Sequence, residues 1–153
     1  MKEKVLEAQL EEMRDYVQHK AKLNTKVSIA PVGWHLAHNL KVIHSILDGL
    51  ENSDPDQYRR SFSWKKQLVY LTGKIPRGKA RAPKRVIPEN NISEGELREQ
   101  INSAKTGVNS IVNQSEKSYF EHPFFGHIKR DETAKFLVIH TEHHLKIIRD
   151  ILK

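Results

Sequence analysis

The chain of 153 residues contains no cysteine, which excludes disulfides, thiolate metal ligands and a cysteine nucleophile. Hydrophobic residues make up 37% and charged residues 29%, and neither an apolar run long enough to span a membrane nor a secretion signal is present, so we expect a globular, cytoplasmic protein without a membrane partner. The formal net charge of +7 comes from one segment, because residues 57–88 hold ten of the 26 lysines and arginines and no acid.

Helical periodicity predicts two helices in the first third of the chain. The first covers residues 2 to about 22, where four apolar residues recur at helical spacing: Leu6, Leu10, Met13 and Val17. The second is expected over residues 28–50, with Ser28 as its N-cap and Pro31 in its first turn.

Residues 51–92 are expected to form a long connection, because they contain four of the six prolines. Within it, residues 58–71 could form a short helix or a strand. A third long helix should begin at Ser93, since Ser93 and Glu96 match the capping-box pattern. After the aromatic-rich turn "YFEHPFFGH", a fourth should run from about Arg130 to Leu152. This pattern predicts one all-α domain over residues 1–153, a four-helix bundle with a long basic crossover between helices two and three.

Two histidines of the last predicted helix occupy the centre of its apolar face. On a helical wheel His140 and His144 lie one above the other, and His143 lies at the edge of that face. A single histidine in such a place is usually a core residue bonded to a carbonyl, but two stacked ones bury several nitrogens that need partners. The spacing of i and i+4 also lets two imidazoles bind one metal ion, so both interpretations stay open at this point.

The second predicted helix supplies a third imidazole in "GWHLAHNLKVIH". The wheel places His35 inside the apolar arc and His38 at its edge, so it slightly favours His35 as the buried residue. Either could join His140 and His144 if the two helices are neighbours. Three neutral imidazoles and an open position form a catalytic type of divalent metal centre, and imidazole does not discriminate between Zn²⁺, Ni²⁺, Fe²⁺ and Mn²⁺.

The segments "WHLAHNL" and "HPFFGHIKRDETAKFLVIHTEHHLKII" resemble the DinB-like superfamily of metal-dependent enzymes, and in particular a small branch of unknown function. The resemblance implies a four-helix bundle in which one histidine of the second helix and an H-x-x-x-H pair of the fourth bind a divalent ion. Carried over, these ligands are His38, His140 and His144, while His35 would support a ligand or line the pocket. His143 resembles an additional histidine of the branch, and its role stays open.

The resemblance also bears on activity and assembly. It implies an enzyme that acts on a small molecule, by thiol transfer or by hydrolysis, through a metal-bound nucleophile. A low-molecular-weight thiol is then a candidate substrate, and a homodimer is a candidate assembly. No residue is assigned as a catalytic acid or base.

Several other residues could belong to the site. Trp34, one turn before His38, could line the pocket. His127 could cover the site from above, although the simpler interpretation is that the "HPFFG" segment plugs the end of the bundle and shapes the turn.

The basic segment 57–88 allows three interpretations. The simplest is a solvated run of charge. The second is a lid over the bundle in which Arg77 or Lys79 contacts an anionic group of the substrate. The third is a surface for nucleic acid or another polyanion on a non-enzymatic binding protein. We rank this one last, because nucleic acid is an unlikely partner for a segment without interleaved aromatics or a known binding motif.

Overall fold

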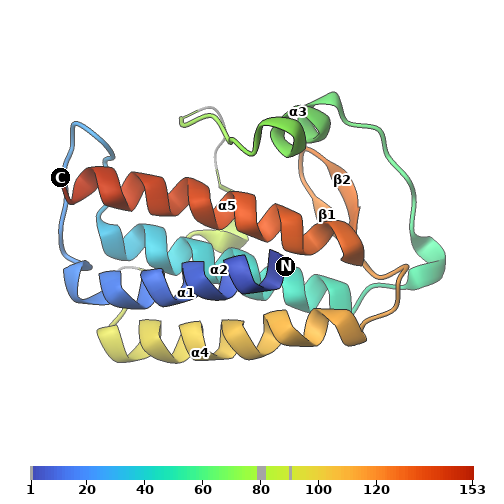
Figure 1. Cartoon of the computed structure of the whole chain (residues 1–153), viewed down its shortest axis with the longest axis horizontal. Helices are drawn as coiled ribbons and strands as arrows, with labels where there is room; N and C mark the ends of the chain where they lie inside the picture. The colour runs from blue at the N-terminus through green and yellow to red at the C-terminus, as the bar shows by residue number, and fades with distance from the viewer. Residues whose placement is uncertain (1, 79–81, 90) are drawn as a thin grey trace.

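Helices make up most of the fold. The structure, a computed structural model, describes residues 2–78, 82–89 and 91–153. Within these residues it contains one two-stranded antiparallel sheet, made of β1 (Tyr119–His122) and β2 (Gly126–Lys129). The same residues form five α-helices (Figure 1): α1 (Lys2–Tyr16), α2 (Val32–Glu51), α3 (Trp64–Thr72), α4 (Glu94–Ser110) and α5 (Arg130–Ile151).

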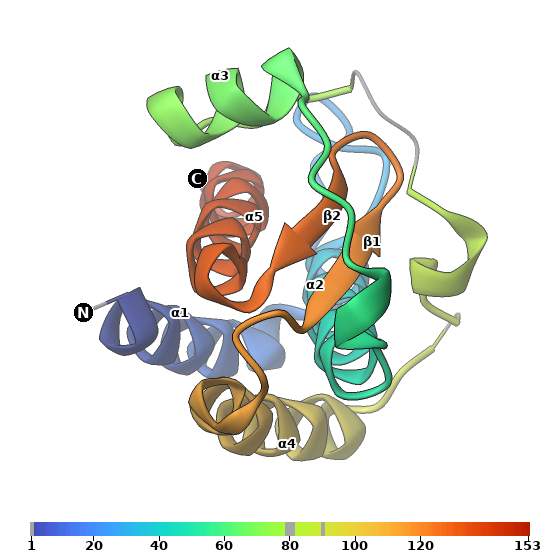
Figure 2. The same cartoon turned by 90° about the vertical axis from the view of Figure 1, so that its right-hand side faces the viewer.

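The four long helices surround the hydrophobic core. Helix α1 packs against α4 and α5, and α2 packs against the same two helices from the other side, as the end-on view in Figure 2 shows. Each contributes fully buried apolar side chains, including Leu6, Leu10, Leu36, Leu40, Leu97, Ile101, Leu137 and Leu145. Because α2 and α5 are direct neighbours, histidines on their facing sides can meet.

The ends of the helices agree in part with the sequence patterns. The capping box of α4 is confirmed, since Ser93 Oγ accepts from the Glu96 N–H at 3.1 Å and Glu96 Oε2 accepts from the Ser93 N–H at 2.8 Å. The prediction of Ser28 as the N-cap of α2 was wrong. The helix begins at Val32 with Pro31 in the capping position, and Ser28 instead contacts the side chain of His35.

The prediction of an all-α four-helix bundle was also wrong, because the fold is α-rich and includes a β-hairpin. The segment expected to be an aromatic turn pairs Tyr119 with Lys129 and His122 with Gly126. Phe120 of the hairpin is buried against Gly49 of α2, where an added Cβ would lie 3.1 Å from Phe120 Cβ. Strands of four residues show little alternation in sequence, so tertiary packing rather than local pattern selects them.

The basic crossover also contains regular structure. Helix α3 starts at Ser63, whose Oγ accepts from the Lys66 N–H at 3.3 Å, and ends at Gly73, whose φ of 63° is left-handed. This helix packs on the outer side of α5 (Figure 2). Further along, the short turn Lys84–Val86 contacts α2. In the described parts of the chain, no helix combines the length and apolarity needed to cross a membrane.

Candidate metal centre

Three histidines from α2 and α5 meet in the interior. One ring nitrogen from each of His38, His140 and His144 lies within 4.8 Å of the other two, and the described residues contain no other cluster of this kind. These are the ligands implied by the sequence resemblance. Nitrogens bound to one tetrahedral zinc ion lie about 3.4 Å apart, so a metal ion would draw the rings together by at most about 1.4 Å. The cluster could therefore hold a metal ion.

The Nδ1 atoms of two of these rings are already occupied. His38 Nδ1 donates to the carbonyl oxygen of Val86 at 2.9 Å, and His140 Nδ1 donates to Asn39 Oδ1 at 2.8 Å. A carbonyl oxygen can only accept, so the proton of each neutral ring sits on Nδ1 and the lone pair sits on Nε2. Metal-binding histidines are commonly held in this way by an oxygen behind the ring.

The third ring is held by a fourth histidine. His144 Nδ1 lies 3.1 Å from His35 Nδ1, and His35 Nε2 lies 2.9 Å from Ser28 Oγ. If His144 binds a metal through Nε2, its Nδ1 donates to His35 Nδ1. His35 must then donate through Nε2 to the Ser28 hydroxyl oxygen. His35 thus lies behind a ligand, and His38 joins the pair on α5.

Burial keeps the rings neutral. It lowers the pKa of His35 to about 4, with a smaller contribution from the charge of His38. Burial likewise lowers the pKa of His38, and it places the pKa values of His140 and His144 well below the ordinary value for histidine. Neutral imidazole is the form that binds metal, so no proton has to be displaced near pH 7. The donor set therefore fits a divalent ion and would leave its charge uncompensated.

Aromatic side chains stack on two of the clustered histidine rings. The Trp34 ring stacks on His38 with centroids 4.9 Å apart and planes 6° apart. On the other side, the Phe136 ring stacks on His140 at 5.8 Å. Trp34, predicted to line the site, thus covers one face of the His38 ring.

The remaining predicted histidines have different surroundings. His143 is half-buried, its ring meets His144 edge-on at 5.0 Å, and it bonds to the backbone of Ile75. His127 lies in the hairpin, where its Nδ1 accepts from the Arg59 N–H at 3.0 Å and its ring stacks on Tyr119. The structure therefore places His143 beside His144 and His127 in contacts that hold the crossover to the hairpin.

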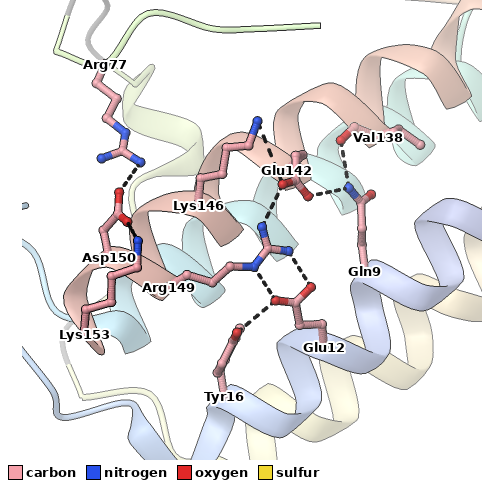
Figure 3. Close-up of polar contacts among 10 residues, drawn as sticks. All are labelled: Gln9, Glu12, Tyr16, Arg77, Val138, Glu142, Lys146, Arg149, Asp150 and Lys153. Carbon is pink, nitrogen blue, oxygen red and sulfur yellow. Dashed lines mark hydrogen bonds and ion pairs between the residues drawn. The ribbon is translucent and has the colours of Figure 1, made fainter.

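Arg77, predicted to contact an anion, lies outside the histidine cluster. Arg77 Nη2 donates to Asp150 Oδ2 at 2.8 Å (Figure 3), and Arg77 lines a hollow of about 200 Å³ together with His143 and Lys146. Lys79 lies outside the described residues. Figure 3 also shows Glu142 bonded to Arg149 and Gln9, on the face of α5 that packs against α1.

Two of the supporting groups were not predicted from the sequence. Asn39 is almost fully buried on α2, and its place in the apolar arc was a detectable signal, since a buried amide needs partners. The Val86 carbonyl had no such signal. It is a backbone group 48 residues away from His38, and only the folded crossover brings it there.

Comparison with known proteins identifies a family. The model of a family described as a protein of unknown function (DUF1569) matches residues 4–150, a range that contains all three clustered histidines. No curated protein and no solved structure matches the chain. The chemistry must therefore be argued from the site.

Proposed function

The chain belongs to the DUF1569 family, and from this premise we propose that it is a metal-dependent enzyme whose divalent ion is bound by His38, His140 and His144. One observation carries the proposal: three neutral imidazoles, two of them buried and one half-buried, converge while each Nδ1 is engaged elsewhere. A histidine with a purely structural role in the core does not need its second ring nitrogen to face the ring nitrogens of two other histidines. The resemblance of the motifs on α2 and α5 to the DinB-like superfamily supports the same ligand set.

The reaction class follows from the donor set. A divalent ion with three neutral ligands supplies Lewis acidity and lowers the pKa of a coordinated water or thiol. The chain's own part is to present the three Nε2 atoms, with Val86, Asn39 and His35 holding the rings from behind. Trp34 and Phe136 keep water from the ring faces of His38 and His140.

Thiol transfer and hydrolysis are the two reactions that we propose for a small-molecule substrate. For thiol transfer the substrate would be a low-molecular-weight thiol. The metal ion would bind it as the thiolate, which is its nucleophilic form. Zinc, nickel, iron and manganese are all compatible with imidazole ligands, so the identity of the ion is a matter for measurement.

Elemental analysis of protein purified without an affinity tag or a chelator tests the proposal. We expect close to one divalent ion per chain in the wild type and none in a His140→Ala, His144→Ala double variant. A His44→Ala variant is the matched control, because His44 lies on α2 but bonds to the Gln100 carbonyl oxygen instead of the cluster. Circular dichroism would show that all variants are folded. A wild type that contains no metal and takes up none of the four ions would refute the proposal.

A substrate screen then tests the enzyme assignment. The metal-loaded wild type and the double variant would be assayed for transfer of small thiols to an electrophile and for hydrolysis of ester and amide substrates. Activity that requires both the metal ion and His144 would support the assignment. Stoichiometric metal without any such activity would leave a metal-binding protein that is not shown to be an enzyme.

The competing proposal is a binding protein whose basic segment 57–88 contacts nucleic acid or another polyanion. Part of its charge is compensated within the fold, since Lys66 pairs with Glu132 at 3.2 Å and Arg77 with Asp150 at 2.8 Å. A polyanion binder should lose affinity steeply as salt is raised. Titration of labelled single- and double-stranded DNA and RNA over a salt series would separate it from a small-molecule enzyme.

A further inference from the structure

Helix α3 turns apolar side chains toward solvent. Trp64, Leu68 and Leu71 follow each other at i, i+4 and i+7, which places them on one face of the helix. The opposite face carries the buried Lys66 and Val69. The usual arrangement, with apolar residues inside and lysine outside, is therefore reversed for these positions.

Two phenylalanines extend this face. Phe62 precedes the helix, and Phe124 of the hairpin is held beside it, because Ser63 Oγ donates to the Phe124 carbonyl oxygen at 3.3 Å. We define the α3 patch as Phe62, Trp64, Leu68, Leu71 and Phe124, whose exposed fractions range from 50% to 86%. Scattered apolar residues are ordinary on a surface, but a group of this size on one helix and the segments beside it marks an interaction site.

The helix is anchored to the rest of the fold. Lys66 Nζ lies 3.2 Å from both carboxylate oxygens of Glu132, and the Tyr70 hydroxyl donates to the Glu132 carbonyl oxygen at 3.4 Å. Lys135 Nζ lies 5.1 Å from the centre of the Tyr70 ring. These contacts hold α3 on α5, beside which it lies in Figure 2. The exposed side chains of the patch are thereby kept away from α5.

The charges around the patch favour one kind of partner. Arg59, Arg60, Lys65 and Lys74 are all exposed, and residues 57–78 contain no acid. A two-fold contact between copies of the chain would place these cations against one another, which opposes association. An anionic surface would instead complement them. Tryptophan, phenylalanine and leucine on one face, with lysine and arginine beside them, are typical of helices that lie in the interface of an anionic membrane.

We propose that the α3 patch binds the surface of an anionic lipid bilayer, with α3 lying in the plane of the interface. Phe62, Trp64 and Leu71 enter the headgroup region, and the exposed cations contact the lipid phosphates. This inference does not depend on the metal centre. It departs from the sequence expectation of no membrane partner, which rested on the absence of a membrane span. A surface helix needs no such span.

Cosedimentation of the full chain with vesicles tests the inference. Vesicles of phosphatidylcholine alone would be compared with vesicles that also contain phosphatidylglycerol, at low and at physiological salt. We expect binding to the anionic vesicles only, and roughly tenfold weaker binding for a Leu68→Ser, Leu71→Ser variant. The matched control is Ile29→Ser, a substitution at an apolar residue that is also exposed but precedes α2. Thermal unfolding would show that both variants are folded.

Fluorescence adds a readout of depth. The chain has two tryptophans, so Trp34→Phe leaves Trp64 as the only indole. Its emission should shift to shorter wavelength when anionic vesicles are added. Absence of binding would overturn the inference, and so would binding that the serine variant retains in full. Sedimentation velocity gives a further contrary outcome: a dimer that the serine variant disperses, without any vesicle binding, would assign the patch to a second copy of the chain.

Discussion

Asn39 and His140 are linked by a hydrogen bond of 2.8 Å across 101 residues of sequence, and the amide can satisfy it in one orientation only. Its Nδ2 donates to Thr141 Oγ1 at 3.2 Å and to Met13 Sδ at 3.2 Å, so its Oδ1 must face the histidine. The direction of this amide determines which nitrogen of His140 carries the proton. It thereby leaves Nε2 free to act as a ligand.

Removal of this amide should weaken metal binding. We expect Asn39→Ala to lower the affinity for Zn²⁺ by roughly 10–100-fold, because the His140 ring loses its orienting acceptor. Isothermal titration of the apoprotein measures the effect. Asn52→Ala, at the exposed C-cap of α2, is the control and should bind as the wild type does. Equal affinities in the two variants would contradict the role assigned to Asn39.

His35 should matter for the metal although it does not bind it. His35→Ala removes the acceptor of His144 Nδ1, so we expect roughly tenfold weaker binding with one ion per chain still bound. A Co²⁺-loaded sample gives a second measurement, since its visible spectrum reports the number of ligands. If the Co²⁺-loaded His35→Ala variant keeps the wild-type spectrum, His35 orients His144 without binding the metal ion itself. Loss of one imidazole from the coordination would instead show that His35 is a ligand.

Stability of the apoprotein should fall in mild acid, partly because of His122. Burial lowers the pKa of His122 to about 4, with Arg85 adding to the effect, and its Nδ1 accepts from the Phe124 N–H at 3.1 Å. In the unfolded chain this ring titrates near 6.5, so between these values the unfolded state binds the proton and the folded state does not. The contribution of neutral His122 to the free energy of unfolding is present above pH 6.5 and is lost as the pH falls toward 4.

The expected loss from this ring between pH 7 and pH 5 is about 2 kcal/mol in the free energy of unfolding. Urea unfolding at the two pH values, in the presence of a chelator, measures it. His122→Phe keeps a ring against Phe125, on which His122 stacks at 4.2 Å, and should show a smaller loss than the wild type. Identical losses in both proteins would show that His122 is not responsible.

One guanidinium group of α5 bridges a carboxylate of α1 and a carboxylate of α5. Arg149 Nε and Nη2 each lie 2.6 Å from a carboxylate oxygen of Glu12, and Nη1 lies 2.7 Å from Glu142 (Figure 3). Arg149→Ala should lower the free energy of unfolding by about 1–2 kcal/mol, since it leaves two carboxylates facing each other. Arg98→Ala is the control, because Arg98 makes a single exposed pair at 3.9 Å with Glu94 and should have little effect in urea unfolding.

The predicted parts of the fold are those that local patterns determine. The α4 start was readable because Ser93 and Glu96 interact within one turn, and α5 because its apolar residues repeat over 22 residues. The hairpin was missed because Phe120 and Ile128 are buried by contacts that no local pattern encodes. Helix α3 stayed undecided between helix and strand, since three of its apolar residues, Trp64, Leu68 and Leu71, face solvent instead of the core.

The same distinction applies to the candidate site. The pair His140 and His144 was visible in the sequence because both lie on one helix. The sequence pattern alone could not decide between His35 and His38. Both are buried, at 4% and 5% exposure, and they lie only about 60° apart on the helical wheel. The resemblance implied His38, and the structure shows the physical difference between the two: His38 bonds backward to Val86, while His35 bonds to another histidine.

The Val86 carbonyl connects the candidate centre to the crossover, which is also tied to α2 by a bond of 3.1 Å from Lys41 Nζ to the Ile87 carbonyl oxygen. Occupancy of the centre and docking of residues 84–89 are then thermodynamically linked. An ion bound by His38 would favour the docked segment, and a docked segment would favour the ion by the same free energy. Protease cleavage of the crossover should accordingly slow as metal is added, so the crossover would report whether the centre is filled.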